Sequence, residues 1–179
     1  SLHADHASAG DLSRGSGLGV SSGANAFSAR SWSTGALDEN DYYGFSLSPD
    51  VGYQLSLSAF EIDERRSGSG IGEWTVRTSL DGFTSDLSPG PISVPDNTNT
   101  RSDQRLVFDG VMYSGITEAL EFRIYGYEAE GSAGTWRIDN VELFGGITAV
   151  PEPASWLAGV AMGLLAMGMR LRKRWAIMV

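Results

Sequence analysis

Leu120-Glu121-Phe122-Arg123-Ile124-Tyr125 is the stretch that decides the fold. Its apolar and polar residues alternate with period two, and in a β-strand this alternation places one row of side chains in a core and the other row on the opposite face. Outward from it, the same alternation occurs at 43–48 and at 53–59, where a change of phase at Phe60 indicates a β-bulge. Further strands are predicted at 27–32, 74–77, 105–108 and 135–144.

Turn and loop signals separate these strands. Pro49-Asp50 and Asp81-Gly82 predict turns, 64–70 predicts an exposed loop, and 86–104, with three prolines, predicts a long connection. No stretch before residue 150 shows sustained helical periodicity. Roughly seven or eight short strands joined by turns are typical of a β-sandwich. We therefore expect an all-β, jelly-roll-like β-sandwich ectodomain at 10–146.

Charge is divided unevenly along the chain. Residues 1–150 hold nine arginines, no lysine and 21 acidic residues, a net charge of −12, whereas 151–179 hold four basic residues and one acid, a net charge of +3. An acidic domain argues against nucleic acid as a partner, because phosphate binding requires clustered Lys and Arg. The chain has no cysteine, so disulfides, thiolate metal sites and cysteine catalysis are excluded.

The first nine residues support two interpretations. Ala7-Ser8-Ala9 is an A-x-A pattern of the kind that precedes signal-peptidase cleavage. Residues 1–9 are therefore either the remnant of a signal peptide or a flexible N-terminus.

The C-terminal residues predict a membrane span. A linker at 147–153 contains Pro151-Glu152-Pro153, and the next 16 residues, 154–169, carry no charge. As a helix they would extend about 24 Å, and a span of 154–171, with Arg170 reaching the interface, approaches the ~30 Å hydrocarbon core. The basic residues that follow place the tail at 172–179 in the cytoplasm by the positive-inside rule, and hence the acidic domain outside.

These three parts, in this order, resemble the PEP-CTERM sorting signal of exported bacterial proteins. The resemblance covers residues 150–175 and implies processing by exosortase, a membrane protease/transpeptidase of exopolysaccharide-producing Gram-negative bacteria. It makes Pro151, Glu152 and Pro153 the recognition motif. It makes Arg170, Arg172, Lys173 and Arg174 the cytoplasmic basic stop.

The last predicted strand carries a second resemblance. Trp136-Arg137-Ile138-Asp139-Asn140-Val141-Glu142-Leu143 is similar to the final strand of several jelly-roll carbohydrate-binding modules. That resemblance implies that the carboxylate ligates a structural Ca²⁺ through oxygen. We expect Asp139 to share its face with Val141 and Leu143, where a carboxylate requires a partner. The partner is either Ca²⁺, an arginine or backbone N–H donors.

Catalytic signals are weak. Both histidines, His3 and His6, lie near the N-terminus, so no Ser-His-Asp triad is expected. Paired carboxylates that could hydrolyse glycosides are drawn from Asp38, Glu39, Asp41, Glu61, Asp63, Glu64 and Asp139. Aromatic residues that could stack on sugar rings are Trp32, Tyr42, Tyr113, Tyr125 and Tyr127.

The sequence therefore favours a non-enzymatic surface or extracellular-matrix protein. Its predicted partners are exosortase and the lipid bilayer, with no nucleic acid and no cofactor other than a structural calcium. The precursor would be anchored in the inner membrane before the protein reaches the cell surface. The alternatives are a carbohydrate-binding module for extracellular polysaccharide and, third, a glycoside hydrolase-like enzyme.

Overall fold

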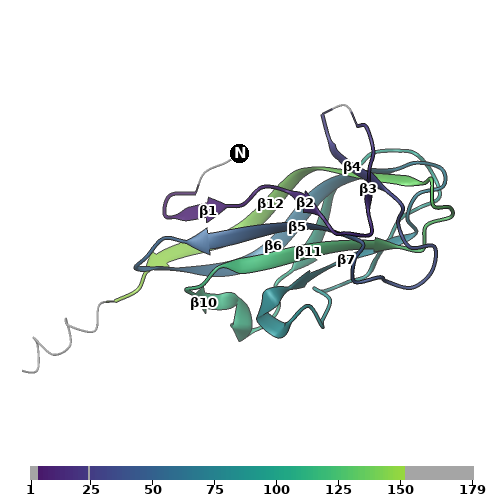
Figure 1. Cartoon of the computed structure of the whole chain (residues 1–179). Helices are drawn as coiled ribbons and strands as arrows, with labels where there is room; N and C mark the ends of the chain where they lie inside the picture. Colours follow the sequence, from purple (N-terminus) through teal and green to yellow (C-terminus); the bar gives the residue numbers. More distant parts are fainter. Residues whose placement is uncertain (1–3, 24, 152–179) are drawn as a thin grey trace, which may run out of the picture. The chain divides into compact units, whose positions relative to one another are not determined.

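The computed structural model describes residues 4–23 and 25–151, which form an all-β domain of two antiparallel six-stranded sheets, the arrangement of a β-sandwich (Figure 1). One sheet has the order β1-β5-β11-β7-β8, with β2 also on β5; the other has the order β10-β6-β12-β4-β3, with β9 also on β6. The first contains β1 (Ala7–Ala9), β2 (Ser13–Arg14), β5 (Tyr42–Pro49), β7 (Glu73–Thr78), β8 (Ile92–Ser93) and β11 (Leu120–Tyr127). The second contains β3 (Gly19–Val20), β4 (Phe27–Arg30), β6 (Tyr53–Arg66), β9 (Arg101–Val107), β10 (Ser114–Ile116) and β12 (Thr135–Ala149).

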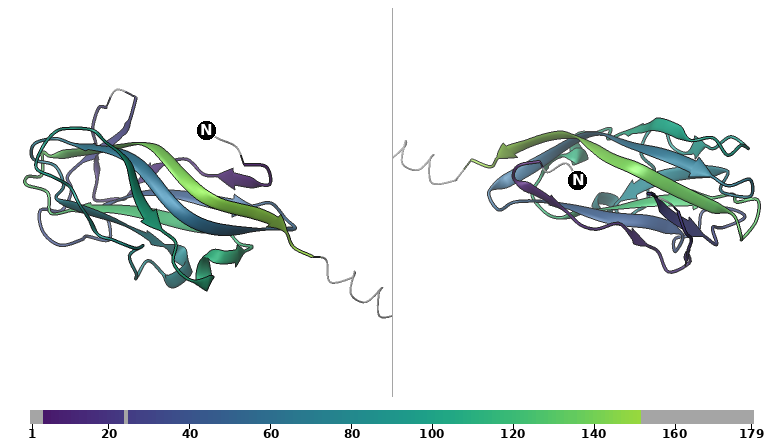
Figure 2. Two further views of the ribbon diagram at one scale, coloured as in Figure 1. Left: turned by 180° about the vertical axis from the view of Figure 1, so that it is seen from behind. Right: turned by 90° about the horizontal axis from the view of Figure 1, so that it is seen from above.

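Described residues include no α-helix and two 3-10 helices, η1 (Ser79–Asp81) and η2 (Val111–Tyr113). From β4 to β7 the chain changes sheet at every step, and it does so again from β10 to β12. Figure 2 shows the two layers from behind and from above. The alternation at 120–125 forms the middle strand of the first sheet, where Phe122 pairs with Phe45 on one side and with Thr78 on the other.

The core between the sheets is aromatic at one end. The rings of Trp32 and Trp136 lie 5.3 Å apart, and Tyr43 stacks on Trp136 at 5.5 Å. The Tyr43 hydroxyl donates to the Trp136 carbonyl at 2.6 Å, which ties β5 of one sheet to β12 of the other. A backbone carbonyl between sheets lacks water, so this bond removes the cost of burying it.

The bulge predicted in β6 is present as a change of phase. Ala59 and Phe60 are adjacent, and both are fully buried. After them the inward positions are Ile62, Glu64 and Arg66, so the predicted exposed loop at 64–70 was wrong in its first three residues. Strand β6 continues to Arg66 because its polar inward side chains, Glu64 and Arg66, find hydrogen-bond and ion-pair partners.

Two other boundaries differ from the sequence prediction. Residues 7–9 pair with Leu47–Pro49 as strand β1, so the β domain includes residues before 10. The predicted long connection at 86–104 contains strand β8 and the beginning of β9. In the part of the chain that the structure describes, no helix has the length and apolarity needed to cross a bilayer. The predicted span at 154–171 lies outside those residues.

A buried carboxylate joins the sheets. The Glu64 side chain of β6 has no exposed surface and forms an ion pair with Arg101 of β9. Its Oε1 accepts the indole N–H of Trp74 at 3.0 Å, and its Oε2 accepts that of Trp136 at 2.6 Å. Trp74 belongs to the opposite sheet, so one carboxylate bonds to three strands across the core. Charge-assisted bonds of this kind offset the cost of removing a carboxylate from water.

We predict that Glu64→Gln lowers the free energy of unfolding by about 3 kcal/mol, because it leaves the partly buried Arg101 guanidinium, whose side chain is 22% exposed, without its ion-pair partner. The measurement is urea denaturation of the full chain in detergent.

Glu61→Gln is the matched control on the same strand. Glu61 pairs with Arg105, also of β9, but Arg105 is 47% exposed, so this pair lies at the surface. The control should cost less than about 1 kcal/mol. Equal losses in the two variants would refute a special role for Glu64.

Candidate functional site

The sorting residues predicted from sequence fall almost entirely outside the described chain. Pro151 is the last described residue and is exposed. Glu152, Pro153 and the basic stop lie beyond it. The site that the structure does describe is formed by the β domain.

Asp139 does not share a face with Val141 and Leu143, so that expectation was wrong. Asp139 and Asn140 are both exposed, and Asn140 has φ +45°, which shifts the alternation of β12 by one residue. Val141 and Leu143 are half-buried against the core, whereas Asp139 points outward. Its Oδ1 accepts the N–H of Asn140 at 2.9 Å, one of the partners considered for it. Within the described residues no cluster of three His, Asp or Glu side chains could hold a metal ion.

Asp139 instead lines a groove of about 200 Å³ on the outer face of the second sheet, which we call the outer groove. Strand β6 contributes three consecutive residues to it, β12 contributes three more, and Ala26 and Thr100 lie at its edges. Its lining is Ala26, Asp63, Glu64, Arg65, Thr100, Arg137, Ile138 and Asp139.

The charged groups of the outer groove have different partners. Asp63 accepts the backbone N–H of Asp103 at 3.0 Å and the side-chain amide of Asn140 at 2.7 Å. The Arg65 Nε donates to the carbonyl of Thr98 at 2.7 Å. The Arg137 Nε is buried and has no hydrogen-bond partner. The carboxylates of Asp63 and Asp139 are thus held by Asn140 of β12 and by the backbone of β9, and not by the two arginines beside them.

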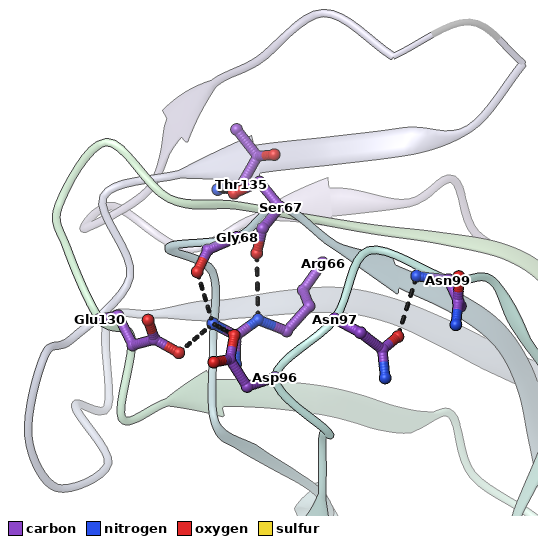
Figure 3. A network of polar contacts seen from close by, with 8 residues as sticks. All are labelled: Arg66, Ser67, Gly68, Asp96, Asn97, Asn99, Glu130 and Thr135. Atoms are coloured by element: carbon purple, nitrogen blue, oxygen red, sulfur yellow. Dashed lines mark hydrogen bonds and ion pairs between the residues drawn. The ribbon is translucent and has the colours of Figure 1, made fainter.

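The next inward residue of β6, Arg66, is held by four residues of the protein (Figure 3). It is only 3% exposed, forms ion pairs with Glu130 and, at 3.6 Å, with Asp96, and donates to the carbonyls of Ser67 and Gly68 at 3.0 Å each. Its side chain therefore ties the end of β6 to two loops. This network explains why Arg66 is buried, because it engages both Nε and Nη2 with the surrounding loops.

The acids proposed for hydrolysis are dispersed. Glu61 and Glu64 are paired with arginines, and of the seven only Asp63, Glu64 and Asp139 line one groove. Asp41, at 5% exposure, lies against Gly17, where an added Cβ would meet its Oδ1 at 1.9 Å. Burial, together with the negative charge of Asp38, raises the pKa of Asp41.

The aromatic residues proposed for sugar stacking are mostly covered. Trp32, Tyr113, Tyr125 and Tyr127 are buried, and Tyr42 is half-buried. On the outer face of the first sheet, Arg123 packs between the rings of Tyr42, at 4.6 Å, and Phe83, at 3.8 Å. Arginine thus fills the positions over these rings that a sugar would use.

Sequence reasoning missed Arg65 and Arg137 as site residues. Arg65 stood in a predicted loop, and Arg137 was seen only as part of the last strand. The available signal was the period-two pattern of 135–139, which places Arg137 and Asp139 on one face. Only the pairing of β6 with β12 brings Asp63 and Arg65 beside Arg137 and Asp139.

Comparisons with known proteins confirm the C-terminal signal. The family model of the PEP-CTERM protein-sorting motif matches residues 149–173. No curated protein sequence matches the chain. A solved structure described as a family two carbohydrate esterase from Clostridium thermocellum in complex with cellohexaose aligns with 80% of this chain at 17% identity and a TM-score of 0.38. The alignment spans 34% of that protein, about a third of its length, and a TM-score this low supports no inference.

We predict that Asp41→Asn stabilises the domain at neutral pH. A folded-state pKa above the ordinary 3.8 means that ionised Asp41 opposes folding once the pH exceeds that folded pKa. A gain of about 1 kcal/mol in the free energy of unfolding corresponds to a rise of about 2–4 °C in Tm for a chain of this size, and we expect that rise at pH 7. The rise should vanish at pH 3, where Asp41 is protonated and uncharged.

Glu39→Gln, in the same loop but exposed, is the control and should change Tm little at either pH. A lower Tm for Asp41→Asn at pH 7 would contradict the assignment.

Proposed function

We propose that the chain is an exported, non-enzymatic protein of the cell surface or extracellular matrix, directed to the envelope by its C-terminal signal. The observation that carries this proposal is the PEP-CTERM protein-sorting motif at 149–173. The motif implies export, a membrane-anchored precursor and processing by exosortase, a membrane enzyme.

Each of the three parts of the signal has its own role in sorting. Prolines on both sides of Glu152 favour an extended backbone, which presents peptide bonds to a membrane protease. The predicted span at 154–171, uncharged up to residue 169, holds the precursor in the inner membrane. Arg170, Arg172, Lys173 and Arg174 keep the C-terminus in the cytoplasm. The β domain, with its net charge of −12, then lies on the outer side.

The proposal that the β domain lacks catalysis rests on how its acids are engaged. Both oxygens of Glu64 accept indole N–H groups, and Asp63 accepts two hydrogen bonds from its neighbours. A general acid or nucleophile requires a carboxyl group available to the substrate. Glu64 and Asp63 instead hold neighbouring strands together.

A second candidate function is favoured by the outer groove. A jelly-roll-like sandwich that presents Asp63, Arg65, Arg137 and Asp139 in one depression offers acceptors and donors for sugar hydroxyls. Few polar groups at fixed positions are what a binding site requires. We propose on this ground that the domain is a carbohydrate-binding module for extracellular polysaccharide.

For the sorting signal, the mature protein on the native cell surface should end before Val179. Intact mass spectrometry of that protein, compared with protein from cells that lack exosortase, measures the difference. We expect loss of the apolar segment and basic stop in the first sample only. A mature chain that still ends at Val179 would show a permanent anchor and refute processing.

For the second function, the full chain in detergent should bind at least one polysaccharide in a glycan array and release no reducing sugar from it. Retention without hydrolysis supports a binding module. Hydrolysis that disappears in Asp63→Asn or Asp139→Asn would instead establish the glycoside hydrolase alternative. No retention by any polysaccharide would refute the carbohydrate-binding proposal and leave the sorting proposal intact.

A further inference from the structure

We propose that the outer groove binds one uronic acid residue, with Arg65 and Arg137 holding its carboxylate and Asp63 and Asp139 accepting its hydroxyl groups. The inference rests on the carbohydrate-binding function proposed above and adds the chemical class of the ligand. Three features of the groove support it: two arginines without an ion pair, the volume of the groove and the polar character of its lining residues.

Arg65 and Arg137 differ from most arginines of this domain. Five of the nine are paired with carboxylates: Arg66, Arg77, Arg101, Arg105 and Arg123. Arg65 and Arg137 have no ion pair among the described residues, although acids outnumber arginines there by 21 to nine. Both line the same groove, on adjacent strands of one sheet. Two guanidinium groups without an ion pair among the described residues can receive the carboxylate of a ligand.

Of the two guanidinium groups, that of Arg137 has fewer of its hydrogen-bond donors satisfied. Its Nε is buried without a hydrogen-bond partner, and a buried unpaired donor is costly. Directly across in β4 lies Ser28, whose hydroxyl is also buried and unpaired. Ser28 is outside the lining of the groove, so the unused donor capacity at the groove itself is that of Arg137. A carboxylate that enters the groove would accept from the remaining N–H groups of this guanidinium.

Asp63 and Asp139 exclude a simple anion and select a sugar. Each is already held in place by Asn140, so neither turns toward the arginines. Sulfate offers only oxygen acceptors, and phosphate carries one or two hydroxyl donors beside its charged oxygens, so neither matches two arginines and two carboxylates as a sugar acid with several hydroxyls does. A uronic acid carries one carboxylate and several hydroxyls on the same ring, so it satisfies donors and acceptors together.

Size and lining set the number of sugar residues. The groove has about 200 Å³, below the range of about 300–1,000 Å³ usual for drug-sized ligands. That volume suits one ring rather than a long segment. None of its lining residues is aromatic, so recognition depends on polar groups and not on stacking. A site built from unpaired guanidinium groups discriminates strongly against a sugar that lacks the carboxylate.

Titration calorimetry with the full chain in detergent tests the proposal. The ligands are short oligomers of galacturonate, glucuronate and mannuronate, with methyl-esterified oligogalacturonate and neutral galactan as matched neutral sugars. A salt concentration of 0.15 M limits the repulsion from distant acids, because the Debye length is then about 8 Å. We expect at least one uronate to bind, its neutral counterpart to bind about tenfold or more weakly, and inorganic phosphate not to compete.

Substitutions assign the binding to the groove. Arg137→Gln and, independently, Arg65→Gln should each weaken uronate binding about tenfold to hundredfold, the effect of losing hydrogen bonds to a charged group. Arg30→Gln is the control, because it makes the same change in charge outside the groove. Arg30 is exposed on the neighbouring strand β4 and, like Arg65 and Arg137, has no ion pair among the described residues. Arg65 is tested separately because removal of half-buried Arg137 could unfold the domain.

Three outcomes overturn the inference. If neutral polysaccharide binds as well as uronate, the domain binds carbohydrate but not through this chemistry. If the two groove variants bind uronate as tightly as Arg30→Gln, the site lies elsewhere. If no glycan of any class binds, the carbohydrate-binding proposal itself fails, a result distinct from the first two.

Discussion

A carboxylate buried between two sheets is the constraint on which much of this domain depends. Glu64 lies at an inward position of β6 and requires strong donors on all sides, since no water reaches it. Arg101 must come from the neighbouring β9, and the indoles of Trp74 and Trp136 must meet from opposite sheets. These requirements fix the register of β6, β7, β9 and β12 at one end of the sandwich. They also orient the outer side chains of β6 and β12, because every second residue of a strand faces the same way. The outer groove is a consequence of that register.

The fold class was predictable because period-two alternation at 43–48, 53–59 and 120–125 depends only on which residues are apolar. The strand after Phe60 was harder. Glu64-Arg65-Arg66 resembles a solvated loop by composition, and only long-range partners make it a strand. Sequence alone could not supply them: Arg101 is 37 residues from Glu64, and Trp136 is 72 residues away. Likewise, the position of Asp139 was wrong because the positive φ of Asn140, which shifts the face of the strand, leaves no trace in an apolar pattern.

The candidate site could be predicted only in part. The sorting motif was recognisable because its signal is local: two prolines, an apolar run and a basic cluster follow one another in the chain, and the match to 149–173 confirms it. A groove made by two strands has no local signal. Asp63 and Asp139 were named among the candidate carboxylates, and Asp139 also as a candidate calcium ligand, but the arginines beside them were not identified as site residues. Aromatic residues misled the search for a sugar platform, because a two-sheet core and packing against arginine bury or cover them.

The place of β12 within its sheet has a mechanical consequence. This 15-residue strand lies between β6 and β4, with hydrogen-bonded neighbours on both sides, and the described chain leaves the domain from its end. A load applied to the C-terminus would pull along β12 and shear its ladder with β6, instead of peeling an edge strand bond by bond. The ladder with β4 spans Thr135–Ile138, at the start of β12, and adds resistance at the far end of the strand. The short strands β1 and β2 lie at an edge of the other sheet, away from that load path. A domain tethered at this end is therefore built to withstand drag.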